Sequence, residues 1–143
     1  MTKLPELKRL LSTSVTARGL RGADLLIYSE CLRQEWPSLL AEVAEGHIAL
    51  SICLEEEHIS HLTAKLATII VMGRPASITV LTVDGSPHCV QAHFSAQQAL
   101  RMTGSAIPVR HLVVEKGVLH EVGPEVVRKA RHLSEVAELM RKG

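Results

Sequence analysis

The strongest constraint on the fold is a repeated alternation between short apolar runs and longer amphipathic segments. Three runs of strand length, at residues 23–29, 47–53 and 76–83, are almost continuously apolar. Such runs are typical of strands buried on both faces of a sheet. Each is followed by a segment whose apolar residues recur at helical spacing. Because parallel strands need crossover connections, this alternation predicts a mainly parallel sheet with helices on both faces.

Proline and glycine residues mark where the predicted helices begin and end. Pro37 lies in the first turn of one helix, and Gly104 follows the last turn of another. Lys116-Gly117 is expected to form a tight turn between a fourth strand and a short antiparallel return strand. Acidic residues 55–57 are placed in the first turn of a helix, where its dipole favours them. The predicted helices cover residues 4–11, 35–46, 55–73, 88–104 and 123–143.

Together these elements predict a three-layer Rossmann-like α/β domain. We expect a mainly parallel four-stranded sheet, an antiparallel edge strand and about five helices. The chain has 143 residues, which is enough for one domain with a substantial core. Residues 1–22 are expected to form an N-terminal helix and linker, and residues 23–143 the core.

The composition excludes several classes of function. Aromatic residues make up only 2% of the chain, whereas modules that stack on bases need aromatic faces. Sixteen basic residues against 15 acidic ones give no electrostatic drive toward nucleic acid. The N-terminus lacks the features of a signal peptide, and the longest apolar run is too short to span a bilayer. An odd count of three cysteines favours a reducing cytoplasm with free or metal-bound thiols.

The three cysteines all follow predicted strands. Cys31, Cys53 and Cys89 come at or just after the ends of the first, second and third strands. The carboxyl ends of parallel strands lie along one edge of a sheet, and ligands of such folds collect there. The thiols are therefore candidates for a shared site, together with neighbouring acidic and imidazole side chains: Glu30, Glu55, Glu56, Glu57, His58, Asp84 and His88. Small buried cysteines are also common in cores, so simple packing is a competing interpretation.

The loop "VDGSPHC", residues 83–89, allows more than one chemistry. Asp84, Gly85 and Ser86 are the candidate cofactor-binding residues, although one glycine without a G-x-G-x-x-G pattern gives little support to a nucleotide site. Cys89 is placed in the first turn of a helix, where a thiol can be activated as a nucleophile. Its candidate assistants are His88, which is adjacent, and His93, which lies four residues on.

A metal site is equally compatible with this loop. Thiolate and imidazole ligands suit zinc or iron, so Cys31, Cys53, Cys89 and His88 are the candidate metal ligands. No C-x-x-C pair supports the assignment. Four other histidines have no partner in the sequence and are expected at the surface or beside strands: His47, His111, His120 and His132.

The segments "LLIYSEC", "SICLEEE" and "ITVLTVDGSPHCV", in that order, resemble the C-terminal domain of a ferredoxin-type iron–sulfur protein family from anaerobes. The resemblance covers residues 23–122 and places Cys31, Cys53 and Cys89 at positions of the family's cysteines, with His88 in place of a fourth. The four-cysteine ferredoxin cluster motifs are absent. The resemblance thus implies a metal or redox-thiol role and not cluster-borne electron transfer.

Three hypotheses follow. The first is a cytoplasmic metal-binding or redox-thiol accessory protein that holds zinc, iron or a small iron–sulfur centre and works with a redox or metalloprotein partner. The second is an enzyme with Cys89 as its nucleophile. The third is a non-catalytic homodimeric module that associates through apolar helix faces and whose cysteines are structural.

Overall fold

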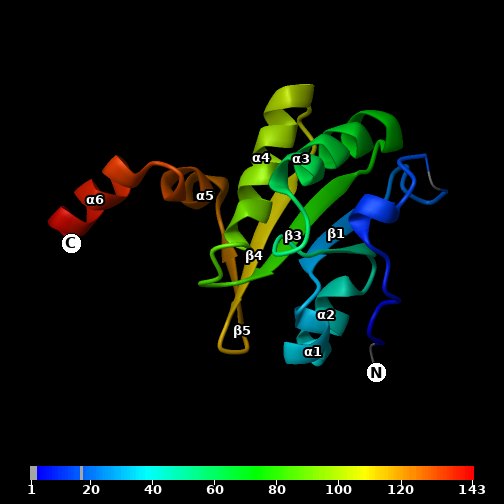
Figure 1. The fold of residues 1–143 in the computed structure, drawn as a ribbon, viewed down its shortest axis with the longest axis horizontal. Helices are drawn as coiled ribbons and strands as arrows, with labels where there is room; N and C mark the ends of the chain where they lie inside the picture. The colour runs from blue at the N-terminus through cyan, green and yellow to red at the C-terminus, as the bar shows by residue number, and fades with distance from the viewer. Residues whose placement is uncertain (1–2, 17) are drawn as a thin grey trace.

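A single sheet lies at the centre of the protein, whose structure is a computed structural model describing residues 3–16 and 18–143. Its five strands are ordered β2-β1-β3-β4-β5 (Figure 1). The first four strands are parallel, and β5 pairs antiparallel with β4. The strands are β1 (Asp24–Ser29), β2 (Ile48–Ile52), β3 (Ser77–Val83), β4 (Val109–Glu115) and β5 (Val118–Val122).

Six α-helices surround the sheet within the described residues. They are α1 (Leu32–Glu35), α2 (Pro37–Ala44), α3 (Ile59–Thr68), α4 (Val90–Thr103), α5 (Pro124–Ala130) and α6 (Leu133–Lys142). A short 3₁₀ turn, η1 (Leu10–Ser12), precedes the sheet, and a π-helical turn, η2 (Ile69–Gly73), extends α3.

The sheet is covered on both faces, as the continuous apolar strands predict. Alternate residues of β1 enter two separate cores: Leu25 and Ile27 pack with α3 and α4, whereas Leu26 and Tyr28 pack with α1 and α2. The predicted three-layer Rossmann-like architecture is therefore confirmed. The strand order also places a switch point between β1 and β3, because the chain runs to β2 on one side of β1 and to β3 on the other.

The expected hairpin is confirmed in detail. Lys116 and Gly117 join β4 to β5, and both have positive φ angles, of 49° and 79°. A two-residue turn of this kind matches the twist of the flanking strands. β5 pairs with β4 over its full length, so the sheet has five strands and not the predicted four.

The predicted N-terminal helix over residues 4–11 is wrong. Only Leu10–Ser12 form a turn, and the residues before them run extended beside β2. The amide of Ser51 donates to the carbonyl of Lys8 at 2.8 Å, and Arg9 forms a parallel bridge with Ser51. Pairing with the open edge of β2 satisfies this backbone in place of a helix. Residues 1, 2 and 17 of the expected N-terminal segment lie outside the described residues.

The predicted helix over residues 55–73 begins later than expected. Glu55, Glu56 and Glu57 lie in a turn before the helix and not in its first turn. His58 is the N-cap, and its Nδ1 accepts a hydrogen bond of 3.0 Å from the amide of Ser60. The imidazole supplies a partner for one of the free amides at the helix start, which explains why α3 begins there.

Three differences account for six helices instead of about five among the described residues: the N-terminal helix is absent, the short α1 precedes the helix predicted over residues 35–46, and the helix predicted over residues 123–143 is divided in two. Trp36 has φ −139° and ψ 59°, so the helical path breaks there before Pro37 starts α2. The predicted helix over residues 123–143 breaks at Arg131 and His132. Val127 is buried and anchors α5, whereas α6 has no buried residue and no packing to keep it in line.

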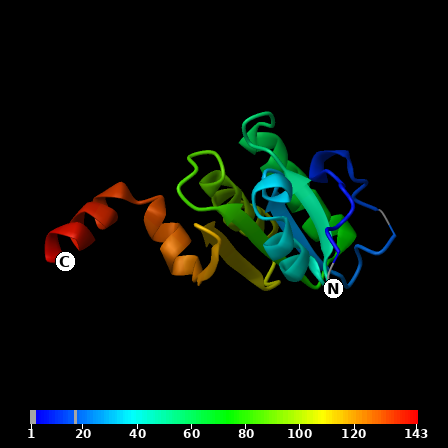
Figure 2. The ribbon, with the colours of Figure 1, turned by 90° about the horizontal axis from the view of Figure 1, so that it is seen from below.

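The C-terminal helices extend beyond the edge of the sheet. Figures 1 and 2 show α5 beside the sheet and α6 farthest from it, in orange and red. The side-chain amide of Gln97 on α4 donates to the carbonyl of Pro124 at 2.9 Å, which ties the start of α5 to the core. No helix among the described residues has the length and apolar character needed to cross a membrane.

Candidate functional site

A small pocket at the carboxyl edge of the sheet contains all three thiols of the chain. Its volume is about 120 Å³. The pocket lies beside the switch point, since Cys31 follows β1 and Cys89 follows β3. We call it the thiol pocket, and its lining residues are Ser29, Glu30, Cys31, Ile52, Cys53, Leu54, Glu55, Ser86, His88 and Cys89.

Cys31 lies at the N-cap of α1, directly beyond the end of β1. The residue is exposed overall, but partial loss of hydration around its thiol, together with the neighbouring Cys89 and Glu35, raises the pKa of the thiol from 9.0 to about 11. Burial disfavours a thiolate, and nearby groups of the same sign disfavour it again. In the protein as it stands, Cys31 is therefore a protonated thiol at neutral pH.

Cys53 is half-buried at the end of β2 and is held by an acidic turn. Its amide donates to a carboxylate oxygen of Glu57 at 2.7 Å, and its carbonyl accepts from the amides of Glu56 and Glu57. Glu57 thus stabilises the turn. Of the acidic residues expected at the site, Glu30 and Glu55 line the pocket, whereas Glu56, Glu57 and Asp84 do not.

Cys89 is half-buried and immediately precedes the first helical residue of α4. Its amide donates to the hydroxyl of Ser86 at 3.2 Å, and its sulfur lies 3.2 Å from the hydroxyl of Ser29. The predicted delivery of this thiol to a helix N-terminus is confirmed. The hydrogen-bond partner of the Cys89 sulfur is therefore the hydroxyl group of Ser29 and not an imidazole.

The two histidines proposed to assist Cys89 have different positions. His88 lines the thiol pocket, and its Nδ1 is 3.7 Å from a carboxylate oxygen of Glu55. His93 is only 2% exposed, and it does not line the pocket. His93 was expected to lie near Cys89 on one face of the helix. The two residues do not share a site, because the imidazole of His93 packs into the core.

His93 forms a buried hydrogen-bonded chain. Its Nε2 lies 2.8 Å from the hydroxyl of Thr82, and its Nδ1 lies 2.9 Å from Nδ1 of His111. Burial, and then the neighbouring His111, lower the pKa of His93 to about 3; burial also lowers the pKa of His111. His111 is 1% exposed and lies within β4, so its expected position at the surface or beside a strand is wrong. The signal for its burial was its place among the apolar residues of β4.

The candidate cofactor-binding residues belong to a turn. Gly85 has a φ of 87°, a conformation that favours glycine. Asp84 and Gly85 line a separate hollow beside His93, and Ser86 lines both that hollow and the thiol pocket. The loop therefore connects the two regions, with Ser86 as the member that reaches the thiols.

Within residues 3–16 and 18–143, no group of three or more His, Cys, Asp or Glu side chains is arranged to hold a metal ion. The three sulfurs share a pocket wall without forming a complete coordination sphere. A metal bound here would have to draw the thiols closer together.

The fold and the edge site define a Rossmann-like α/β protein. A family model described as a Rossmann-like domain matches residues 17–142, and the chain belongs to that family. The comparison with curated proteins and the comparison with solved structures gave no match.

Proposed function

We propose that the thiol pocket binds a thiophilic transition metal or a small iron–sulfur centre through Cys31, Cys53 and Cys89, with His88 as a further ligand. The protein would act as a metal-handling or redox-thiol accessory to a partner protein. The observation that carries the proposal is the presence of all three thiols, from three separate strand–helix junctions, in one pocket. The resemblance of these junctions to the ferredoxin-type family is a second ground.

The size of the pocket supports a metal over an organic cofactor. Its volume is about 120 Å³. Sites for drug-sized ligands usually measure roughly 300–1,000 Å³, so a nucleotide exceeds this space, whereas an ion or a small cluster fits it.

The raised pKa of Cys31 would make metal binding in this pocket depend on pH. Its raised pKa results from missing hydration and from the adjacent Cys89. A bound cation removes this penalty, because a coordinating thiol is deprotonated by the metal. Metal binding should therefore release protons from the pocket.

The alternative of a Cys89 nucleophile has weaker support. His93, one of its two candidate bases, is buried against Thr82 and His111. His88 has its Nδ1 near Glu55 rather than in a hydrogen bond with Cys89. A nucleophile normally forms a hydrogen bond with its activating base.

The test is metal analysis of protein purified without oxygen, followed by titration with Co²⁺. We expect bound metal, thiolate-to-cobalt absorption and proton release. Replacing any one of the cysteines by serine should weaken metal binding about tenfold or more: Cys31→Ser, Cys53→Ser or Cys89→Ser. Even residues that only form hydrogen bonds to a metal ligand contribute that much to metal affinity. His88→Ala should weaken it as well, whereas His61→Ala, which removes an exposed imidazole of α3 outside the pocket, should not.

A content below roughly a tenth of an equivalent, with no cobalt absorption, would exclude the metal role, because thiolate sites bind tightly. If metal is absent but two of the thiols form a disulfide reversibly with oxidised glutathione, the redox-thiol form of the proposal holds. If all three thiols stay reduced and bind nothing, both forms are wrong.

A further inference from the structure

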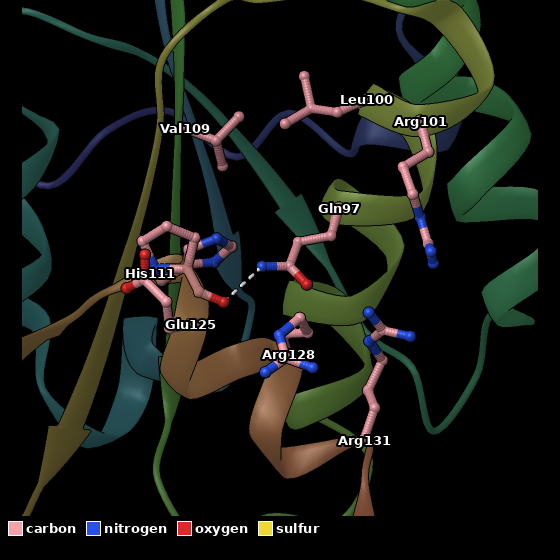
Figure 3. A pocket seen from close by; sticks show the side chains of 9 residues that line it. Gln97, Leu100, Arg101, Val109, His111, Glu125, Arg128 and Arg131 are labelled. Atoms are coloured by element: carbon pink, nitrogen blue, oxygen red, sulfur yellow. Dashed lines mark hydrogen bonds between the residues drawn. The ribbon is translucent and has the colours of Figure 1, made fainter.

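The largest hollow described on the protein lies far from the thiols, between α4, α5 and the start of β4. Its volume is about 480 Å³, within the range of small-molecule sites. Leu100, Val109 and Pro124 provide apolar walls, and His111 forms part of the floor (Figure 3). We call it the arginine groove. Because β4 begins at Val109 and α4 ends at Thr103, the groove is at the opposite edge of the sheet from the thiol pocket.

Three arginines line this groove. Figure 3 shows Arg101 and Arg131 to the right of Gln97, with their guanidinium groups pointing toward each other, and Arg128 below Gln97. The groove has one carboxylate, that of Glu125, which lies on the His111 side and away from them. Guanidinium groups cannot lose their charge at physiological pH. Water and salt screen part of their mutual repulsion, and an anion bound between them would remove the rest.

The protein itself supplies little of that anionic charge. Among the described residues, Arg101 and Arg131 form no ion pair, and Arg101 donates only to the amide oxygen of Gln98, at 2.9 Å. Arg128 contacts Glu135 of α6 at 3.2 Å through one Nη, so its other donors are available. Helix C-termini favour cations, which explains why arginines occur here. It does not explain why their donors converge without an acceptor.

Arg131 provides the second, independent observation. Its Nε is buried and has no hydrogen-bond partner, and among the described residues it is the one buried side-chain nitrogen or oxygen in this state. Buried polar groups are almost always paired, so an exception needs an explanation. Since no protein acceptor holds the Nε–H, the side chain can turn it toward a ligand in the groove without breaking a hydrogen bond.

We propose that the arginine groove binds the phosphate group of a small phosphate monoester with an apolar body. Arg131 and Arg101 grip the phosphate oxygens with their planar forks, and Arg128 adds a third cation. The lining side chains, three arginines and one glutamate, sum to a charge of +2, and Glu135 offsets part of it through Arg128, so the groove keeps a positive excess that favours a phosphate anion. The apolar walls would contact the organic part of the ligand. A free phosphate ion would leave these walls uncovered.

The experiment is a titration of the full chain with phenyl phosphate, followed by calorimetry and by amide NMR shifts. Phenyl phosphate should bind saturably and more tightly than inorganic phosphate, and phenol should not bind. Arg131→Gln should weaken binding about tenfold or more, since hydrogen bonds to charged groups are worth that much. Arg131→Lys should also weaken it, because lysine keeps the charge but loses the fork.

The matched control is Arg141→Gln, which removes the same charge from an exposed position of α6. It should change the dissociation constant by less than about twofold, as expected for a distant surface charge. Thermal melts establish that each variant is folded, and Arg101→Gln replaces Arg131→Gln if that variant is not. Equal losses in Arg131→Gln and Arg141→Gln, or no saturation by about 10 mM phenyl phosphate, would overturn the proposal.

Discussion

The thiol pocket and the arginine groove both gather groups that repel one another when charged, at opposite edges of the same sheet. In the pocket, loss of hydration and then the neighbouring Cys89 raise the pKa of Cys31 to about 11, so this thiol keeps its proton and carries no charge. In the groove, Arg101 and Arg131 cannot do so and face each other without a carboxylate. The comparison shows that similar crowding leaves a thiol neutral, because a thiol can keep its proton, whereas it leaves guanidinium groups permanently charged.

The buried pair of His93 and His111 lies between the two sites. His93 lines the hollow beside residues 84–86, and His111 lines the arginine groove. Neutral imidazoles linked to Thr82 keep charge out of the core between them. The two sites share no lining residue, so each can be tested by substitutions that leave the other's side chains in place.

The largest expected effect concerns the reactivity of Cys31. A pKa of about 11 instead of 9.0 lowers its thiolate fraction at pH 8 about a hundredfold, and only the thiolate reacts with iodoacetamide. Alkylation of Cys31 in the folded protein should therefore be about that much slower than in urea, measured by mass spectrometry of its peptide. Cys89→Ser, which removes a group that contributes to the raised pKa of Cys31, should speed it. Equal alkylation rates in the folded and unfolded protein would show that the fold does not raise the pKa of Cys31, and the comparison with the arginine groove would then fail.

An intermediate effect concerns stability in acid. The folded-state pKa of His93, about 3, lies below its ordinary value of 6.5, so unfolding takes up a proton between these limits. Stability should rise with pH through this window and be lost as the pH falls, by roughly 1.4 kcal/mol per pH unit for each such histidine. The measurement is urea unfolding at a series of pH values.

His93→Gln isolates that contribution. It should destabilise the protein near neutral pH by about 1–3 kcal/mol, because it disturbs buried hydrogen bonds. It should also flatten the pH dependence by about one proton. His120→Gln, at an exposed position of β5, serves as the control and should change neither quantity. An unchanged slope in His93→Gln would mean that other groups cause the acid sensitivity.

The smallest effect sharpens the charge argument for the groove. Glu135 contacts both Arg128, at 3.2 Å, and Lys129, at 3.7 Å. Glu135→Gln should release Arg128 toward the groove and tighten phenyl phosphate binding by roughly two- to threefold, as expected for an exposed pair. Glu138→Gln, in the same helix but paired with Arg141, should have no effect. Weaker binding in Glu135→Gln would show that this pair positions the groove and does not compete with the ligand.

Much of the fold could be predicted because its signals are local. The strand periodicity of residues 23–29 and 76–83, and the positive-φ turn at Lys116-Gly117, depend on neighbours in the sequence. The failed prediction of an N-terminal helix depended on a distant partner, because Lys8 and Arg9 pair with Ser51 of β2. The start of α3 was misplaced for a local reason, because the imidazole of His58 caps the helix at Ser60, after the acidic residues.

The candidate site was predictable only as an edge of the sheet. Strand order along the chain placed Cys31, Cys53 and Cys89 at carboxyl ends, and parallel pairing brings such ends together. Spacing alone could not distinguish His88, which reaches the pocket, from His93, which does not. Side-chain direction depends on how α4 packs against β3 and β4.

The sequence by itself determined the alternating α/β architecture, the mainly parallel sheet and the common edge of the thiols, because these follow from periodicity and chain order. The tertiary structure alone decided that the three thiols line one pocket, that His93 meets His111, and that Arg101 and Arg131 face each other. These contacts join residues far apart in sequence. They arise from the packing of α4 and α5 on the sheet, which no local pattern encodes.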